Sequence, residues 1–197
     1  MISFDLESGY YHVVVASEDQ KFLGFQLFGK RYVFCELPFG RLRYACYAFT
    51  EVCKVPVGQL RAKGIRVLPY LDDFLCALQN MPQAVADEAR RVFERLGFLI
   101  NFAKSVLVPT KRIENLGFVV DTYAMTYEVT SRRMQKFVTA ADDLFQAGSG
   151  NGLVPARLVA RVTGHIAAAA LVLERRGRLH SHYLNHSIYQ AGTLEFP

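Results

Sequence analysis

The sequence lacks several patterns that mark common classes of protein. It contains no P-loop, no glycine-rich dinucleotide fingerprint and no Gly-x-Ser-x-Gly nucleophile elbow, so the enzymes built on these motifs are not indicated. Its longest apolar run, residues 166–173, has eight residues, far fewer than the roughly 18 that cross a bilayer. The N-terminus carries no secretory signal pattern. We therefore expect an intracellular protein, cytoplasmic or nuclear, that is not secreted and has no membrane partner.

Cysteine and charge are both limited. The 197 residues include four cysteines, none in a Cys-x-x-Cys pair, and all among apolar or aromatic neighbours, which favours reduced core thiols over a disulfide framework. A content of 51% hydrophobic and 21% charged residues excludes a disordered chain and provides for a core. The net charge of +5 permits a phosphate-backbone partner without requiring one.

Periodicity predicts a mixed α+β body followed by helices. We expect short strands over residues 2–6, 12–16, 22–28, 31–37, 105–108, 113–120 and 125–129, with a hairpin turn at Gly29-Lys30. A further pair of strands within residues 65–78 would join at Asp72-Asp73. Helices are expected over residues 44–62, ended early or kinked by Pro56, and over residues 81–96. Three more are expected over residues 132–147, 155–173 and 175–189.

Two adjacent carboxylates, Asp72 and Asp73, interrupt an otherwise apolar stretch. Like charges so close repel, so either one is protonated or a cation compensates them. Asp5 ends another apolar strand, and we expect it to converge with Asp72, since Mg²⁺ prefers such oxygen ligands. Strand alternation points Asp72 and Asp73 to opposite faces, so one of them would share a metal with Asp5 unless the turn redirects the other. The alternative is an ordinary Asx-type hairpin turn.

Five segments in order resemble the successive motifs of reverse transcriptases: FDLESGYYHV at 4–13, LPFG at 37–40, YLDD at 70–73, GFLINFAKS at 97–105 and LGFV at 116–119. The resemblance covers residues 2 to about 130 and is strongest to the DIRS-like, tyrosine-recombinase-encoding retrotransposons. The tail, with ARLVARVTG at 156–164, is similar to their thumb-like helices. The resemblance as a whole implies a palm-type antiparallel sheet with packed helices over residues 1–130. It also implies a helical thumb- or connection-like region over residues 131–197.

The resemblance also implies a role for each motif residue. Asp5, Asp72 and Asp73 would be the catalytic carboxylates and the ligands of Mg²⁺, for which Mn²⁺ could substitute. Lys104 would assist the leaving pyrophosphate. Tyr10 would be the steric gate against a ribose 2′-OH, and Phe39 and Gly40 would lie against the nucleotide. The turn of Leu116 and Gly117 would grip the primer end.

The function implied is RNA-directed DNA polymerisation, a two-metal nucleotidyl transfer to a primer 3′-OH. The partners implied are an RNA or DNA template with its primer, and deoxynucleoside triphosphates. Since Asp5 follows Met1 so closely, we expect the chain to be a fragment of a longer protein, for which a polyprotein that includes fingers and RNase H regions is one candidate. Without the basic fingers, we expect the chain to be inactive alone. The alternative is a catalytically inactive palm-fold domain that binds nucleic acid or acts as a scaffold. Two features favour that alternative: one residue more than the family usually has in the stretch after Gly40, within residues 41–46, and the missing fingers.

Overall fold

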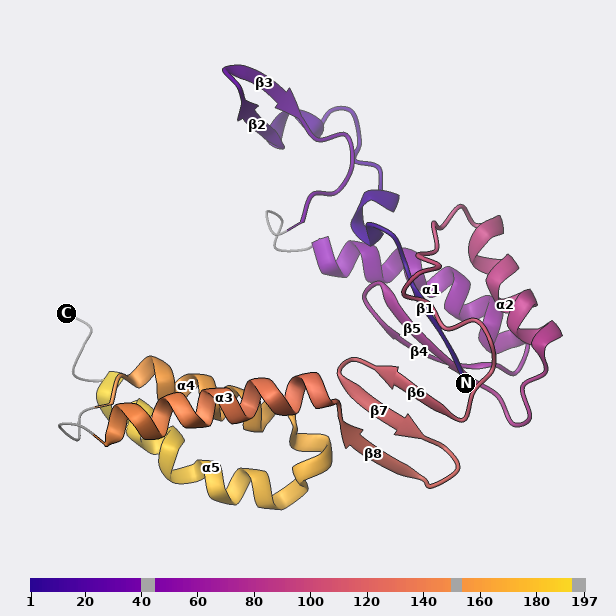
Figure 1. The fold of residues 1–197 in the computed structure, drawn as a ribbon. Coiled ribbons are helices and arrows are strands. Elements are labelled where there is room, and N and C mark those ends of the chain that lie inside the picture. Colours follow the sequence, from indigo (N-terminus) through magenta and orange to yellow (C-terminus); the bar gives the residue numbers. More distant parts are fainter. Residues whose placement is uncertain (40–44, 150–153, 193–197) are drawn as a thin grey trace. The chain divides into compact units, whose positions relative to one another are not determined.

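The structure, a computed structural model, describes residues 1–39, 45–149 and 154–192. The chain divides into two compact units, Met1–Ile113 and Glu114–Pro197, whose elements follow one another along the sequence (Figure 1). The fold is α+β with antiparallel strand pairs and packed helices, as the sequence predicted.

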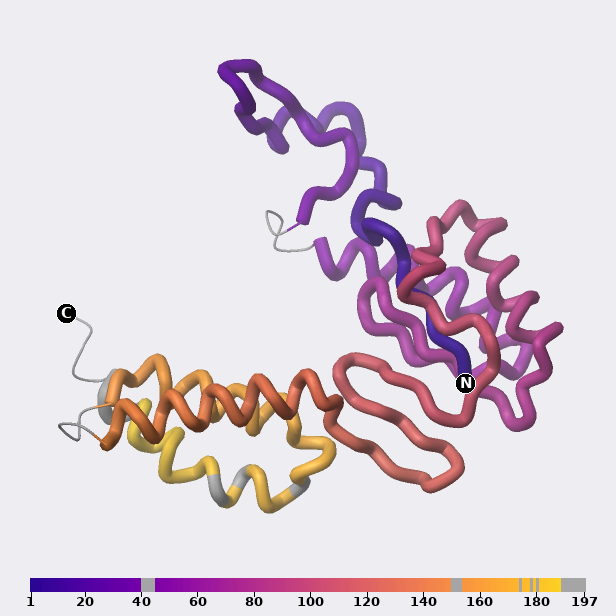
Figure 2. Tube along the Cα trace, viewed as in Figure 1, coloured from indigo at the N-terminus to yellow at the C-terminus, as the bar shows by residue number. Residues whose placement is uncertain are grey.

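A three-stranded antiparallel sheet forms the centre of the first unit. Its strands are β1 (Ile2–Asp5), β4 (Arg66–Tyr70) and β5 (Asp73–Ala77), in the order β1-β5-β4. Residues 97–106 run along the other edge of β1, where isolated antiparallel bridges join Leu6 to Ile100 and Ser3 to Val106, and the chain trace follows this course (Figure 2). The expected strand at 105–108 is therefore reduced to a single bridge residue.

Two helices, α1 (Ala45–Ala62) and α2 (Gln83–Arg95), enclose the core of this unit. The fully buried Phe93 of α2 contacts the rings of Phe4 and Phe74, with centroids 4.8 and 4.9 Å away. The expectation that Pro56 ends α1 early was wrong, because the helix continues to Ala62. Pro56 is buried, so packing offsets the lost backbone hydrogen bond.

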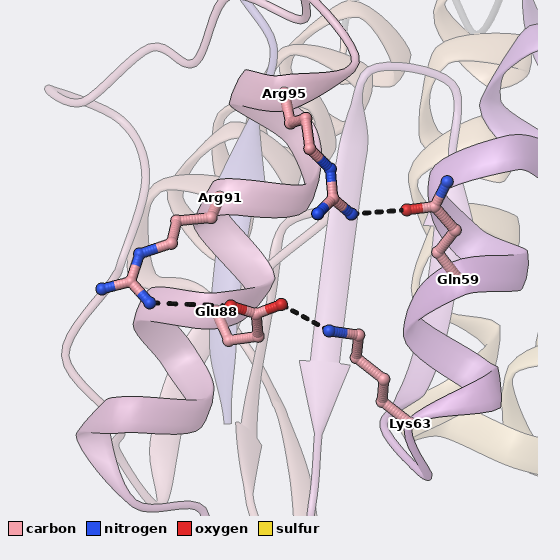
Figure 3. A network of polar contacts seen from close by, with 5 residues as sticks. All are labelled: Gln59, Lys63, Glu88, Arg91 and Arg95. Atoms are coloured by element: carbon pink, nitrogen blue, oxygen red, sulfur yellow. Dashed lines mark hydrogen bonds and ion pairs between the residues drawn. The ribbon is translucent and has the colours of Figure 1, made fainter.

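Polar contacts link the outer surfaces of the same two helices (Figure 3). Glu88 of α2 pairs with Lys63, just beyond the end of α1, and with Arg91 of its own helix at 3.6 Å. Arg95 donates a hydrogen bond of 3.1 Å to Gln59 of α1. These side chains are partly exposed, so the network adds to the core packing only modestly.

Short elements connect β1 to α1. They are the 3₁₀ turns η1 (Gly9–His12) and η2 (Gln20–Phe22) and the hairpin of β2 (Gly24–Leu27) and β3 (Lys30–Val33). The hairpin turn lies at Phe28-Gly29, one residue before the expected place, and both residues have positive φ. The strand expected over residues 12–16 is only a bridge between Val14 and Glu36.

The cysteines are free thiols but not all are core residues. Cys53 and Cys76 are buried, as the sequence predicted, whereas Cys35 and Cys46 are exposed. The prediction of core positions was wrong for these two, because Cys35 follows the exposed strand β3 and Cys46 lies on an exposed side of α1. Apolar neighbours in the sequence do not by themselves show that a side chain is buried.

The second unit combines a small sheet with helices. The strands β6 (Arg112–Asn115), β7 (Phe118–Asp121) and β8 (Thr126–Val129) follow in that order, and Thr130 caps α3 (Ser131–Gly148). The helices α4 (Ala156–Ala168) and α5 (Ala170–Gly192) meet at Ala169, five residues before the break that the sequence predicted. Among the described residues, no helix has the length and hydropathy required of a membrane span.

Candidate active site

Asp5 and Asp73 face each other at one end of the central sheet. They are direct cross-strand partners in the antiparallel register of β1 and β5, as are Phe4 and Phe74 one position further in. Because side chains alternate, the two aspartates share the face opposite to that of the buried phenylalanines. The core therefore determines the position of the carboxylates: the residues that bury one face place both acids on the other.

Asp72 lies in the two-residue turn between β4 and β5. Its carbonyl accepts a hydrogen bond of 2.9 Å from the Leu6 amide, which joins the turn to the end of β1. Leu71, the other turn residue, has φ +55°, a conformation that costs energy for a bulky side chain. Gly9 allows the close approach of η1, since a Cβ there would lie 3.0 Å from the Asp72 Cβ and 2.9 Å from the Phe49 ring.

The carboxylates act on one another electrostatically. Burial raises the pKa of Asp5 above its usual range, and Asp72 raises it further while Lys104 lowers it. The pKa of Asp73 is also raised, first by burial and then by the charges of Asp72 and Asp5. The three acids expected from the sequence thus form one electrostatic group. In the described part of the chain, however, no three His, Cys, Asp or Glu side chains lie in an arrangement ready to hold a metal ion.

Lys104 lies beside this group, with its ammonium 3.7 Å from Asp5 Oδ1. The adjoining residues hold β1 through two bonds: the Asn101 amide donates to the Asp5 carbonyl at 2.9 Å, and Ser105 Oγ accepts from the Asp5 amide at 3.0 Å. Residues 101–105 bulge away from regular pairing with β1 between the two bridges, and Lys104 belongs to this bulge. Sequence reasoning missed Asn101 and Ser105, whose only signal was membership of the GFLINFAKS segment.

Tyr10 is buried near the start of α1, with 6% of its surface exposed. Its ring contacts Phe39 edge-to-face at 4.5 Å and Phe49 at 5.2 Å. Its hydroxyl donates to Cys46 Sγ at 2.9 Å, and this bond together with burial raises the pKa of Tyr10 to about 12. The structure thus brings Tyr10 and Phe39 together. Gly40, the third expected nucleotide-binding residue, lies outside the described residues.

Leu116 and Gly117 form the turn between β6 and β7 in the second unit, with φ of +50° and +76°. A Cβ on Gly117 would lie 2.8 Å from the Arg133 guanidinium carbon. That guanidinium covers the Phe118 ring at 4.7 Å and donates to the Ala168 carbonyl at the end of α4, at 3.3 Å. Arg133 therefore joins the turn to two helices, a role that nothing in the sequence motifs indicated.

The solved structures that share this fold include three of foamy viral proteins. The foamy viral protease-reverse transcriptase dRH in complex with double-stranded DNA has a TM-score of 0.66 and 18% identity, covering 85% of this chain and 27% of that chain. The foamy viral protease-reverse transcriptase in complex with an RNA/DNA hybrid has a TM-score of 0.66 and 16% identity. The match covers 96% of this chain and 26% of that chain. The foamy viral protease-reverse transcriptase in complex with double-stranded DNA has a TM-score of 0.64 and 16% identity. The match covers 98% of this chain and 41% of that chain. The architecture is that of reverse transcriptases.

The sequence gives the same classification. Residues 1–120 match the family model of reverse transcriptase (RNA-dependent DNA polymerase), so the chain belongs to that family. It is also 30% identical over 127 residues to the retrovirus-related Pol polyprotein from transposon gypsy of Drosophila melanogaster. That alignment covers 60% of this chain and 11% of the polyprotein, so the chain corresponds to a small part of that relative.

Proposed function

We propose that this chain is the palm and thumb-like portion of an RNA-directed DNA polymerase from a DIRS-like retroelement. Residues 1–130 would form the palm and residues 131–197 the thumb-like region. The observation that carries the proposal is the direct pairing of Asp5 with Asp73 across β1 and β5, with Asp72 in the adjoining turn. Like charges directly opposite each other destabilise a sheet. Binding of a divalent cation in a polymerase would explain why this chain has them.

The donor set fits Mg²⁺, with Mn²⁺ as a substitute, because all three acids offer hard oxygen ligands and repel one another. Burial, and then the charge of the neighbouring carboxylates, raises the pKa values of Asp5 and Asp73. Asp5 and Asp72 would be the principal ligands, with Asp73 beside them. Bound divalent cations would supply charge stabilisation for phosphoryl transfer to a primer 3′-OH. Lys104, held near Asp5, would offset charge on the leaving pyrophosphate.

The other expected residues would position substrates. Tyr10, held rigidly by Phe39, Phe49 and Cys46, would form the wall that excludes a ribose 2′-OH, and Phe39 with Gly40 would line the nucleotide site. The turn of Leu116 and Gly117 would contact the primer end. These roles rest on the motif resemblance.

The partners proposed are an RNA or DNA template with its primer, and deoxynucleoside triphosphates. The foamy viral relatives are described with double-stranded DNA and with an RNA/DNA hybrid, which supports a duplex ligand here. Arg157 of α4 is exposed, while Arg161 pairs with Asp143 of α3, so Arg157 is the better candidate for a phosphate contact. A fusion to fingers and RNase H regions within a longer polyprotein is also proposed.

A second function has one observation in its favour. The described acids do not form a ready three-ligand cluster, as would suit a catalytically inactive domain that binds nucleic acid or acts as a scaffold. The polymerase and an inactive nucleic-acid-binding domain both predict binding of a primer–template, whereas a scaffold predicts none. Only the polymerase predicts a divalent cation at the primer 3′ end.

Iron-mediated cleavage distinguishes the two functions. Fe²⁺ replaces Mg²⁺ in the presence of the chain and a labelled primer–template, and ascorbate with peroxide then generates radicals at the metal. We expect strand cleavage confined to the primer 3′ end, lost in Asp5→Asn/Asp72→Asn and retained in the control Asp142→Asn, which changes an exposed residue of α3. Binding without localised cleavage, or equal cleavage by the double variant, would favour the inactive domain.

A further inference from the structure

His12, at the end of η1, uses both of its ring nitrogens in bonds to the main chain. Nδ1 lies 2.9 Å from the Gly9 carbonyl oxygen, and Nε2 lies 2.8 Å from the Leu99 amide nitrogen. A carbonyl needs a donor and an amide needs an acceptor, so the partners require a neutral imidazole with its proton on Nδ1. Sequence reasoning gave His12 no role beyond its place in the first motif segment.

We propose that His12 is a positioning residue that holds residues 97–105 against β1 and thereby places Lys104 beside Asp5. The proposal deepens the proposed function, because the Lys104–Asp5 pair belongs to that active site. The bond of His12 to Leu99 connects η1 with the segment that follows α2, and 87 residues of sequence separate the two partners. Among the described side chains, His12 is the acceptor of the Leu99 amide.

The contacts of Leu99 carry the effect toward the site. Its amide donates to His12, while its carbonyl accepts a bond of 2.8 Å from the Glu7 amide. One residue later, Ile100 bridges to Leu6, and the Asn101 amide then donates to the Asp5 carbonyl. His12 thus fixes the first residue of a continuous hydrogen-bonded register along the end of β1.

The register determines where Lys104 lies. The Lys104 amide bonds to the carbonyl of Asn101 at 3.2 Å and to its side-chain oxygen at 3.3 Å, so the turn that carries Lys104 begins at the register residue. The Lys104 side chain is 68% exposed, and little packing can therefore orient it. Its ammonium comes within 3.7 Å of Asp5 because the backbone of the bulge is held in place.

Aromatic contacts hold the His12 imidazole in the orientation that lets Nε2 accept from the Leu99 amide. The ring lies against Phe98, with centroids 5.3 Å apart, and Phe98 in turn contacts the buried Phe93 at 5.9 Å. His12 is therefore supported by the core on one side and bonded to the main chain at both nitrogens. Such support reduces the entropy lost in presenting Nε2 to Leu99.

Two substitutions separate the two bonds. In His12→Gln, the side-chain oxygen can reach the place of Nε2 and accept from Leu99. In His12→Asn, the shorter amide can keep the bond to Gly9 but leaves Leu99 without its acceptor. We expect the amide of Leu99 to exchange roughly fivefold faster in His12→Asn, as the loss of one ordinary hydrogen bond implies, and near the wild-type rate in His12→Gln.

The position of Lys104 is read from its ¹⁵N-labelled ammonium group. Asp5→Asn should shift this signal in the wild type, because the pair is close, and should shift it less in the His12→Asn background. His12→Gln should restore the shift, and His182→Asn, at an exposed position of α5, is the control. The ¹⁵N spectrum of wild-type His12 should show a neutral ring protonated at Nδ1.

The opposite results would overturn the proposal. These are a ring protonated at Nε2, or equal responses of Lys104 to Asp5→Asn in the His12→Asn and wild-type backgrounds. A fold lost in both His12 variants would show that His12 stabilises the whole unit rather than the position of Lys104, and would overturn it as well. None of these readouts requires polymerase activity, so a failure of the proposed function would leave this result separately interpretable.

Discussion

The turn at Leu71-Asp72 and the turn at Leu116-Gly117 are supported in different ways. Both place a leucine at positive φ, Leu71 in the first unit and Leu116 in the second. The first turn is held by a backbone bond from Leu6 and adjoins a fully buried core. The second is contacted by the Arg133 side chain, which also covers the Phe118 ring and reaches α4, and its Gly117 carbonyl accepts a longer backbone bond of 3.4 Å from the Thr130 amide. The turn of Asp72 is thus supported by the main chain and the core, whereas the expected primer-end turn combines one longer backbone bond with the contacts of one side chain, Arg133.

The largest effect should come from removing the core beneath the carboxylates. Phe93→Ala deletes a ring that is fully buried and contacts three other aromatic rings. We expect a loss of about 4 kcal/mol in the free energy of unfolding of the first unit. The matched control is Phe145→Ala in α3, where the ring is 72% exposed. Urea denaturation followed by amide signals from each unit measures both, and equal losses would contradict the comparison.

The second prediction concerns the side chain that supports the other turn. Arg133→Met removes the guanidinium from Phe118, Gly117 and the α4 carbonyl, and should cost about 2 kcal/mol in the second unit. Arg132→Met changes an exposed neighbour on the same helix and should cost little. Thermal unfolding of both variants provides the test. A loss no larger than that of the control would show that the turn has other supports.

The third prediction tests the cost of the opposed carboxylates. The pKa of Asp73 is raised in the fold, so the folded state binds more protons than the unfolded state between the ordinary and the raised pKa. Stability therefore falls as the pH rises through that window. Without divalent cations, Asp73→Asn should gain about 1 kcal/mol at neutral pH, and the gain should vanish below the ordinary carboxyl pKa.

Denaturation in EDTA over the pH range from acid to neutral measures this gain. Asp142→Asn, which removes one exposed carboxylate of α3, controls for the loss of a single negative charge. A neutral-pH loss of stability in Asp73→Asn would show that Asp73 makes a favourable contact rather than a repulsive one.

The smallest effect should come from the surface network of Figure 3. Lys63→Met removes a partner of Glu88, and exposed ion pairs contribute only about 0.3 kcal/mol. The difference from wild type should shrink further in concentrated salt, since salt screens such pairs. A loss comparable to that of Phe93→Ala would mean that polar contacts, rather than the aromatic core, hold α1 and α2 together.

Much of the first unit could be predicted because its strands carry strong local patterns. The apolar segment before Asp5 and the existence of an acid-bearing hairpin follow from alternation and turn chemistry alone. Its turn lies at Leu71-Asp72, one residue before the expected Asp72-Asp73, because Asp73 already pairs with Tyr70. The pairing of Asp5 with Asp73 rather than Asp72 did not follow from these patterns, because register depends on which residues the core buries. The contributions of His12 and Arg133 also escaped prediction. Each acts through partners that are remote in the sequence, and no local pattern encodes such a contact.

We propose that Asp5, Asp72 and Asp73 together bind a divalent cation. The most direct measurement is titration of the ¹⁵N-labelled chain with Mn²⁺, whose paramagnetism broadens nearby amide signals. We expect selective broadening of the amides of Leu6, Asp72 and Asp73, with none at these positions in Asp5→Asn/Asp72→Asn. Equal broadening in the wild type and the double variant, or broadening centred elsewhere in the chain, would contradict the claim.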